Sequence, residues 1–184
     1  MKRPPEPLTK EEAIALIEGC NPNRATGVRN RAIIAALWRS QLRIGEVLAL
    51  RVVDYERDRL RILKAKGGNY RVVGVDRKTR SLIEEWLKIK PESDYLFCST
   101  SGKQLKDTST FRKLFKRLQV QTGQKKRCHP HGMRHTGAAE LAREGVPLII
   151  ISEQLGHSNV ATTDTYIRHL VAEDVVKAIK KRNW

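Results

Sequence analysis

Apolar residues recur at intervals of three and four along several parts of this chain, the spacing that gathers them on one side of an α-helix. The first run follows Thr9-Lys10-Glu11-Glu12, a capping box that predicts a helix start, and Gly19 and Pro22 predict its end. Further helices are predicted over residues 26–39, 43–50, 77–88, 108–121, 130–144, 147–155, 162–169 and 170–181. In the second helix, the predicted buried stripe consists of Ala32, Ile33, Ala36 and Leu37.

The pattern changes between the third and fourth helices. Leu60 and Ile62, and then the run from Tyr70 to Val75, have the character of β-strands. Gly67-Gly68-Asn69 between them predicts a tight turn, so the two runs form an antiparallel hairpin. Residues 95–98 are a candidate third strand. The chain is therefore expected to be α+β, mainly α, with one small antiparallel sheet.

The length and composition fit one globular domain. A chain of 184 residues suits a single hydrophobic core, and no internal repeat, low-complexity segment or Gly/Ser linker divides it. The longest apolar stretches, residues 32–38 and 146–151, are too short to span a membrane, and no apolar signal-peptide segment follows the basic start. Three cysteines, an odd number without paired spacing, favour a reducing compartment. We expect a cytoplasmic protein without a membrane partner.

The charge balance indicates a polyanionic partner. Lys and Arg number 36 against 20 Asp and Glu, for a net charge of +16. A surplus this large is typical of proteins that bind nucleic acid. A generally solubilising surface and attraction to acidic membranes are the alternatives. The sequence shows neither a basic amphipathic anchor nor a lipidation motif that would support the membrane alternative.

The segment His131-Gly132-Met133-Arg134-His135 is the strongest candidate for a functional site. Pro130 is suited to the first position of a helix, so these residues occupy its first turns. At helical spacing, His131, Arg134 and His135 share the stripe of Ala138, Leu141 and Ala142, while Thr136, Glu140, Arg143 and Glu144 form a face predicted to be solvated. Titratable groups within a core-facing stripe usually mark a site, although a lone histidine in a first turn is more often structural.

Four other residues are weaker candidates when each is taken alone. Arg43 lies one helical turn before Glu46, and Lys66 lies in the predicted hairpin turn. His157 follows Leu155-Gly156, and Tyr166 comes nine residues later. The ordinary interpretations are a surface ion pair, a solvated turn lysine and a structural aromatic residue.

Taken together and in order, these segments resemble the tyrosine recombinases, the integrase and Xer-type site-specific DNA recombinases. The resemblance rests on Leu42-Arg43-Ile44-Gly45-Glu46, on Lys66 in a Gly-rich hairpin, on His131-x-x-Arg134-His135-Thr136, on Leu155-Gly156-His157-Ser158 and on Tyr166. It covers the chain from about Leu8 through the C-terminal helix. Gly74, where the family often has proline, and His129, where a small residue is commoner, depart from the family pattern.

The resemblance implies a role for each of six residues. Arg43 and Arg134 would hold the non-bridging oxygens of the scissile phosphate, and His131 and His157 would hydrogen-bond it. His131 would also help to take the tyrosine proton. Tyr166 would attack phosphorus to give a 3′-phosphotyrosyl link, and Lys66 would protonate the departing 5′ oxygen.

General chemistry agrees with these roles. Charge builds on the oxygens of a transferring phosphoryl group, and fixed guanidiniums stabilise it. A phenol with a pKa of about 10 benefits from a base and cationic surroundings. The phosphotyrosyl link keeps the energy of the broken bond, so no nucleotide cofactor is expected. No metal ion is expected either, because the two arginines, Lys66 and the histidines would supply the positive charge that a metal otherwise provides.

The resemblance also bears on organisation and partners. Residues 1–184 are expected to form a single catalytic domain, without the N-terminal core-binding domain that these recombinases usually carry, and both an excised fragment and a naturally minimal recombinase stay open. Double-stranded DNA is the expected partner. Residues 171–182 form an amphipathic pattern, and in related recombinases the terminal helix docks into a neighbouring protomer. We therefore expect self-assembly on DNA, as a synaptic tetramer, through this helix.

Three alternatives stay open on the sequence. One is DNA relaxation like that of type IB topoisomerases, which use similar chemistry. A second is a DNA-binding relic or regulator that does not cleave. The third is a zinc site built from Cys128, His129, His131, His135 and His157, although Cys128-His129-x-His131 lacks the paired spacing of structural zinc sites.

Overall fold

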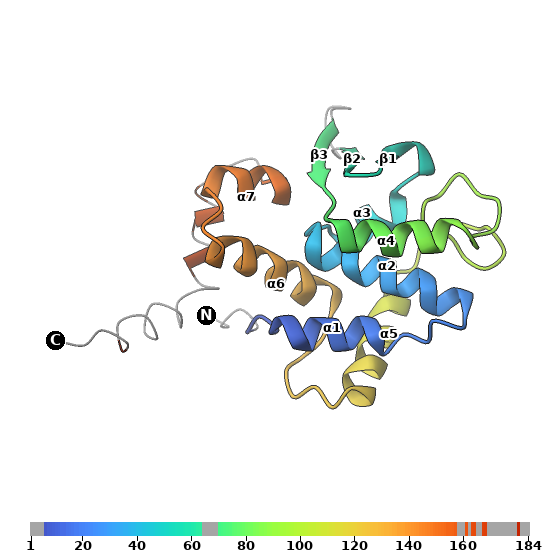
Figure 1. Ribbon diagram of the computed structural model, residues 1–184, viewed down its shortest axis with the longest axis horizontal. Coiled ribbons are helices and arrows are strands. Elements are labelled where there is room, and N and C mark those ends of the chain that lie inside the picture. The colour runs from blue at the N-terminus through green and yellow to red at the C-terminus, as the bar shows by residue number, and fades with distance from the viewer. Residues whose placement is uncertain are drawn as a thin grey trace.

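The computed structural model describes residues 6–63 and 70–157, together with residues 161, 163, 164, 167, 168 and 180. The elements within these residues are shown in Figure 1. They are α1 (Lys10–Glu18), α2 (Ala25–Arg39), α3 (Ile44–Ala49), the 3₁₀ helix η1 (Val52–Asp54), β1 (Tyr55–Glu56), β2 (Arg59–Leu63), β3 (Tyr70–Gly74), α4 (Arg77–Leu87), α5 (Ser109–Gln121), α6 (Pro130–Arg143) and α7 (Leu148–Leu155). The predicted fold class, mainly α with a small antiparallel sheet, is confirmed.

Local sequence explains where several helices begin. The capping box predicted at Thr9 is present, because Thr9 Oγ1 accepts from Glu12 N at 3.2 Å and Glu12 Oε2 accepts from Thr9 N at 2.7 Å. Asp76 caps α4 by accepting from Thr79 N at 2.7 Å. His129 caps α6, with Nδ1 accepting from Gly132 N at 3.0 Å. These bonds satisfy N–H groups that the first turn of a helix leaves without partners.

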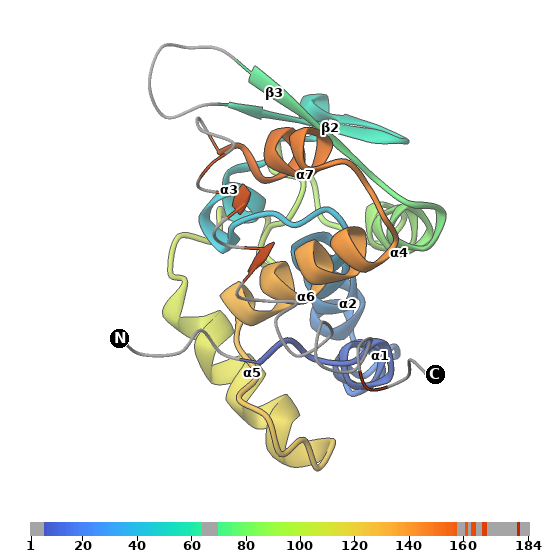
Figure 2. The same ribbon diagram turned by 90° about the vertical axis from the view of Figure 1, so that its left-hand side faces the viewer.

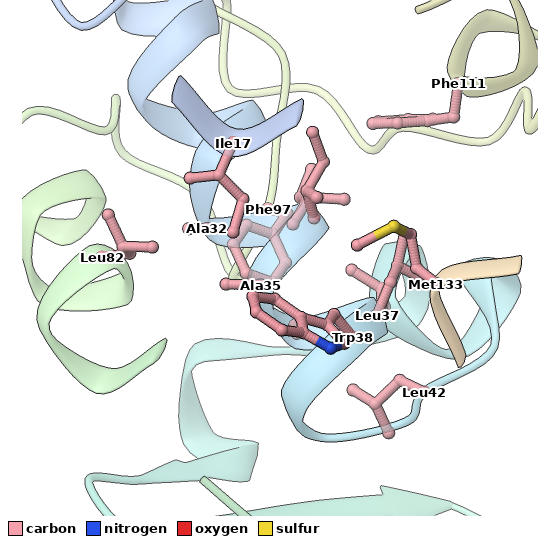
Figure 3. Packing of buried hydrophobic residues seen from close by; sticks show 14 of the residues in the cluster. Ile17, Ala32, Ala35, Leu37, Trp38, Leu42, Leu82, Phe97, Phe111 and Met133 are labelled. Carbon is pink, nitrogen blue, oxygen red and sulfur yellow. The ribbon is translucent and has the colours of Figure 1, made fainter. Parts of the chain in front are cut away.

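The main core is built around α2, which is buried along most of its length. The predicted stripe of Ala32, Ile33, Ala36 and Leu37 is buried, but so are Ile34 and Ala35. Helices α1, α4 and α6 pack against α2, and Figure 3 shows Ile17, Leu82 and Met133 approaching it from different sides. A helix enclosed in this way buries residues all round, so the sequence pattern understates its burial.

The sheet lies at one end of the molecule, and α1 and α5 lie at the other (Figures 1 and 2). Its strand order is β1-β2-β3 and both pairs are antiparallel, with Leu60 opposite Val73 and Ile62 opposite Arg71. The two predicted strands are thus confirmed, while the predicted turn at Gly67-Gly68-Asn69 lies outside the described residues.

The third strand predicted over residues 95–98 is wrong. Tyr95 and Cys98 form only isolated bridges, to Arg51 and Gln104. The third strand is β1, only two residues long, which reverses onto β2 through Arg57 with a φ of 47°. A strand this short has no alternation to detect in a sequence.

The solvated face predicted for α6 is correct at Arg143 and Glu144, which are exposed, but wrong at Thr136 and Glu140. Thr136 is fully buried, donating from Oγ1 to Gly132 O and accepting from Leu8 N. Glu140 Oε2 accepts from Trp38 Nε1 at 3.0 Å and from Arg39 Nη1 at 2.8 Å. Helix α6 is therefore covered on more than one side, because the N-terminal segment and α2 both pack on it.

Among the residues that the structure describes, helix α6 contributes to two separate hydrophobic cores. Met133 belongs to the main core. The smaller core consists of Ala138, Ala139, Ile151, Leu155 and Ile167. Figure 2 shows α7 between α6 and the strands β2 and β3, and α7 contacts both α6 and β3.

Residues 161, 163, 164, 167 and 168 have helical backbone, in agreement with the helix predicted over residues 162–169. Of the helix predicted over residues 170–181, only Lys180 belongs to the described residues. No helix among the described residues is both long and apolar enough to cross a membrane.

Candidate active site

Arg43 stands at the N-cap of α3, where it remains largely accessible. Its backbone is extended, and its side chain is 47% exposed. Glu46, one turn into the helix, accepts from Arg43 Nη1 at 2.9 Å and from Arg43 N at 2.8 Å. The predicted pairing of Arg43 with Glu46 is present, and it orients a guanidinium that can still face a ligand.

Arg134 is held in a different way, because its side chain is 2% exposed. Its Nη1 donates to Gln41 O and its Nη2 to Leu155 O, both at 2.7 Å. These bonds engage two of the five N–H donors of the guanidinium and fix its plane. Arg134 therefore joins the turn after α2 to the end of α7.

The turn that supplies the Gln41 carbonyl has a strained backbone. Gln41 is 2% exposed and has a φ of 48°, a conformation that residues with a side chain rarely adopt. Its Nε2 donates to Trp38 O and to Arg39 O, both at 2.9 Å, and these bonds hold the turn. Nothing in the local sequence indicates this role for Gln41.

His131 and His135 lie one helical turn apart on α6 and contact each other. Their ring centroids are 4.0 Å apart in an edge-to-face arrangement, with His131 exposed and His135 buried. Lost hydration on the packed side of the His131 ring, together with the Arg134 and Arg43 guanidiniums, lowers its pKa below the usual value. Burial and the neighbouring rings and Arg134 lower the pKa of His135 to about 3. Both rings are therefore neutral at neutral pH.

His157 follows directly on Gly156, which ends α7 in the left-handed conformation with a φ of 64°. His157 Nδ1 lies 2.8 Å from Thr163 Oγ1, and Thr163 Oγ1 lies 3.1 Å from Ser152 Oγ. Burial, and then Arg134, Arg43 and Arg71, lower the pKa of His157 to about 4. The field of the same arginines thus reaches both His131 and His157.

Three distant parts of the chain accordingly meet in one place: the start of α3, the first turns of α6 and the turn after α7. Of the six predicted catalytic residues, the structure brings together Arg43, His131, Arg134 and His157. Lys66 and Tyr166 lie outside the described residues. This combination of fixed guanidiniums and neutral imidazoles suits a phosphate oxyanion.

Comparison with known proteins assigns the family. The sequence profile of the Phage integrase family matches residues 6–173. The chain belongs to the phage integrase family. The resemblance to this family seen in the sequence is therefore confirmed.

Similar proteins from this family share most of the chain. A tyrosine recombinase from Pseudothermotoga lettingae is 32% identical over 185 residues, covering 98% of this chain and 62% of the relative. A tyrosine recombinase XerC from Thermodesulfovibrio yellowstonii is 28% identical, covering 91% of this chain and 60% of the relative. The chain thus spans about three fifths of the length of these relatives.

Solved structures of recombinases also match the fold. The crystal structure of XerA recombinase superposes with a TM-score of 0.80 and 26% identity, covering 100% of this chain and 68% of that one. XerH site-specific recombinase bound to a palindromic difH substrate, a post-cleavage complex, gives a TM-score of 0.76 and 28% identity, covering 96% and 53%.

The geometry of the described residues does not support the zinc alternative. Among the residues the structure describes, no three His, Cys, Asp or Glu side chains are grouped so as to hold a metal ion. His129 Nδ1 is engaged as the cap of α6, and Cys128 Sγ lies 3.4 Å from Lys126 O. Two of the five residues in that alternative therefore have local structural roles.

Proposed function

We propose that this chain cleaves and rejoins DNA strands at specific sites through a 3′-phosphotyrosyl intermediate formed by Tyr166. Membership of the phage integrase family supports this, as do relatives named tyrosine recombinases. The observation that carries the proposal is the convergence of Arg43, His131, Arg134 and His157 from three separate parts of the chain.

The proposed reaction conserves bonds and charge at each step. The Tyr166 oxygen forms a bond to phosphorus as its proton passes toward His131, and the bond from phosphorus to the 5′ oxygen breaks. Lys66 protonates that oxygen. Arg43 and Arg134 stabilise the charge on the non-bridging oxygens, and His157 hydrogen-bonds the same phosphate. A 5′-hydroxyl of a partner strand then attacks phosphorus and releases Tyr166.

Arg134 suits this role because its orientation exists before substrate binds. The carbonyls of Gln41 and Leu155 hold the guanidinium plane at 2.7 Å each. Donors that are fixed in advance need no reorganisation as charge develops in the transition state. The lowered pKa of His131 keeps its ring neutral at neutral pH, as a proton acceptor requires.

The proposed partners are double-stranded DNA and further copies of this chain. XerH site-specific recombinase has been solved bound to its palindromic difH substrate, and the net charge of +16 here favours DNA as the ligand of this chain. We propose that the segment 171–184 links protomers into a synaptic tetramer on DNA. Deleting it should then reduce assembly on DNA, measured by light scattering, more than it reduces affinity for a single site.

The test is a covalent trap. A pool of duplexes of varied sequence, each carrying a nick, lets the short 5′-hydroxyl fragment diffuse away after cleavage, so the adduct accumulates. The parent should give an adduct that survives denaturation, and recovered DNA then reveals the preferred site. Tyr166→Phe should give none while it still binds DNA. Adduct should also form in excess EDTA, because the arginines, histidines and Lys66 supply the positive charge.

The outcomes separate the alternatives. An adduct that persists in Tyr166→Phe would remove Tyr166 as the nucleophile. A parent that binds DNA but forms no adduct would favour a non-cleaving regulator. Adduct formation with relaxation of supercoiled plasmid, but without strand exchange between duplexes, would favour the topoisomerase-like alternative.

A further inference from the structure

Arg71 occupies an inward-facing position on β3, where a charged side chain is unusual. It stands opposite Ile62 on β2 and is 7% exposed. The adjacent residues Tyr70 and Val72, which point to the other face of the sheet, are both exposed. A guanidinium in such a place is expected only where partners compensate its charge and its N–H groups.

Both oxygens of Glu46 act as partners of the two terminal nitrogens, while Arg71 Nε has no hydrogen-bond partner among the described residues. Arg71 Nη1 donates to Oε1 and Arg71 Nη2 donates to Oε2, each at 2.9 Å. Two parallel bonds of this kind fix the relative orientation of the carboxylate and the guanidinium. A lysine, with one compact ammonium group, cannot reproduce them.

The same carboxylate holds other arginines of the site. It accepts from Arg43 Nη1 and Arg43 N, as described above, and Arg134 Nη1 lies 3.9 Å from Oε2. Burial disfavours a charged Glu46, but the bonds from Arg71 and Arg43 outweigh burial and lower the Glu46 pKa. Glu46 is therefore ionised at neutral pH and gathers three arginines around one charge.

Arg71 also packs closely against the turn that presents His157. A Cβ added to Gly156 would lie 2.6 Å from Arg71 Nε and 2.7 Å from Arg71 Cζ. Real Cβ atoms do not approach other atoms so closely, so the Arg71 guanidinium occupies the space that a side chain at position 156 would need. Arg71 thus lies between the carboxylate that orients Arg43 and the residue that precedes His157.

We propose that Arg71 is a positioning residue of the active site, fixing the Arg43–Glu46 unit of α3 relative to the Gly156–His157 turn of α7. The proposal rests on the proposed function, because Arg43 and His157 must contact the same phosphate for their spacing to matter. Small displacements of such groups have large effects on rate. Arg71 itself need not touch the substrate.

Two substitutions separate this role from that of an ordinary buried ion pair. Arg71→Lys keeps the positive charge but loses the two parallel bonds, and Arg71→Met loses both. Arg61→Met is the matched control, because Arg61 lies on β2 with its side chain exposed, bonded to Val53 O and Glu56. The measurements are thermal stability, DNA affinity, the single-turnover rate of adduct formation at saturating nicked duplex, and the His157 pKa by NMR.

If Arg71 positions the site, Arg71→Lys lowers the adduct rate about 10- to 100-fold while DNA affinity and folding stay close to the parent. Arg71→Met lowers the rate at least as much. It also raises the His157 pKa, because the Arg71 charge is one of those that lower it. Arg71→Lys leaves that pKa near the parent value, and Arg61→Met changes neither quantity.

Adduct rates within about threefold of the parent in folded Arg71→Lys, well below the expected loss, would overturn the proposal. If Arg71→Met does not fold, the Arg71→Lys rate decides alone. If the parent forms no adduct, the proposed function fails separately. The NMR signals of the His157 ring in Arg71→Lys, which keeps the charge, then decide whether Arg71 fixes the Gly156–His157 turn: displaced signals support the proposal, and unchanged signals overturn it.

Discussion

Arg43 and Arg134 have the same charge, but they differ in burial and in how much each contributes to the stability of the fold. Arg43 is half exposed and bonded only to Glu46 among the contacts described above. Arg134 is buried, and its guanidinium satisfies two backbone carbonyls. The same substitution at the two positions should therefore separate chemistry from folding.

Arg43→Ala and Arg134→Ala should each lower adduct formation by about 100-fold or more, as expected for loss of one fixed donor to developing charge. Arg43→Ala should change the free energy of unfolding by less than about 1 kcal/mol, as exposed ion pairs do. Arg134→Ala should cost roughly 2–4 kcal/mol, because it leaves two buried carbonyls without donors. Single-turnover assays and urea denaturation measure the two effects. Cleavage within a few-fold of the parent would remove that arginine from the proposed clamp.

The neutral histidines give stability a dependence on pH. The pKa of His157 is lowered to about 4 and that of His135 to about 3, against an ordinary 6.5. Below pH 6.5 the unfolded chain therefore binds protons that the folded chain does not, so the free energy of unfolding falls as pH falls. Above pH 6.5 the histidines are neutral in both the folded and the unfolded chain, so they no longer lower the free energy of unfolding.

Denaturation at several pH values between 6.5 and about 5 should show this decline. The window stays above the range in which Glu46 and Asp76, whose pKa values are lowered, begin to take up protons. His157→Gln should show a shallower decline, because one of the histidines with a lowered pKa no longer titrates. Stability that is flat or rises on acidification across this window would contradict the lowered pKa values.

Several single residues of the site were predictable from the sequence, and others were not. Arg43, His131, Arg134 and His157 stood out because the order and spacing of short motifs identified them. Gln41 did not, since its role depends on a backbone turn and a carbonyl. The only sequence signal for Arg71 is that a basic residue shares a strand face with the apolar Val73. Its partner, Glu46, is distant in the sequence. The ion pair of Arg71 with Glu46 exists only through tertiary structure.

At the scale of elements, the crossing of α2 and α6 leaves no room at Gly137. A Cβ there would lie 1.9 Å from Trp38 O and 2.6 Å from Gln41 Nε2. Because one of these atoms belongs to the backbone, the helices themselves would have to separate. The turn after α2 would move with them, and that turn supplies the carbonyl that orients Arg134.

Gly137→Ala should lower the free energy of unfolding by at least about 2 kcal/mol, since overpacking a close contact displaces backbone. Gly45→Ala is the control, because nothing lies within 4 Å of a Cβ built on Gly45 of α3. That change should be neutral or stabilise by up to about 1 kcal/mol, the difference in helix propensity. Urea denaturation of both variants tests the close packing. Equal changes in the free energy of unfolding for Gly137→Ala and Gly45→Ala would show that α2 and α6 can move apart at little cost.

Helices were more predictable than strands for a physical reason. The helical spacing repeats over several turns, and caps such as Thr9 mark the ends, so bounds near those observed followed from local sequence. Strand β1 has two residues and exists because β2 lies beside it. The face of α6 at Thr136 and Glu140 reads as polar, yet specific partners bury it. Hydrophobic periodicity predicts that polar residues are exposed, so it fails for those that distant hydrogen-bond partners bury.

The whole molecule carries a charge of +16, and one basic surface lies on α5. Arg112, Lys113, Lys116 and Arg117 are all exposed there. A hollow of about 270 Å³ between α3 and the segment before α5 is lined by Gly45, Leu48 and Thr108, among others. The start of α5 therefore adjoins α3, the helix that Arg43 caps, and α5 is a candidate contact for the proposed DNA partner.

DNA affinity should fall steeply with salt, with a log–log slope of roughly 0.9 for each phosphate neutralised. Replacing Arg112 and Lys116 by Gln should reduce the slope by roughly two if each contacts one phosphate. The matched control replaces Arg77 and Lys88, at the two ends of α4, and should leave the slope nearly unchanged. Fluorescence anisotropy over a range of salt measures it. A slope near zero for the parent would contradict electrostatic binding.

The boundary between the two hydrophobic cores passes through the candidate active site. His157 follows α7, whose Ile151 and Leu155 belong to the small core, whereas Arg43 caps α3, whose Val47 and Leu48 belong to the large one. Across the boundary run polar contacts: Arg134 to Leu155 O, Gln154 Oε1 to Gly74 N, and Arg71 against Gly156. If α7 moved away from the sheet, these polar contacts would break while the main core stayed packed. A phosphate bound by both Arg43 and His157 would link the two sides of this boundary. DNA binding, as proposed, would then stabilise the arrangement of the catalytic residues.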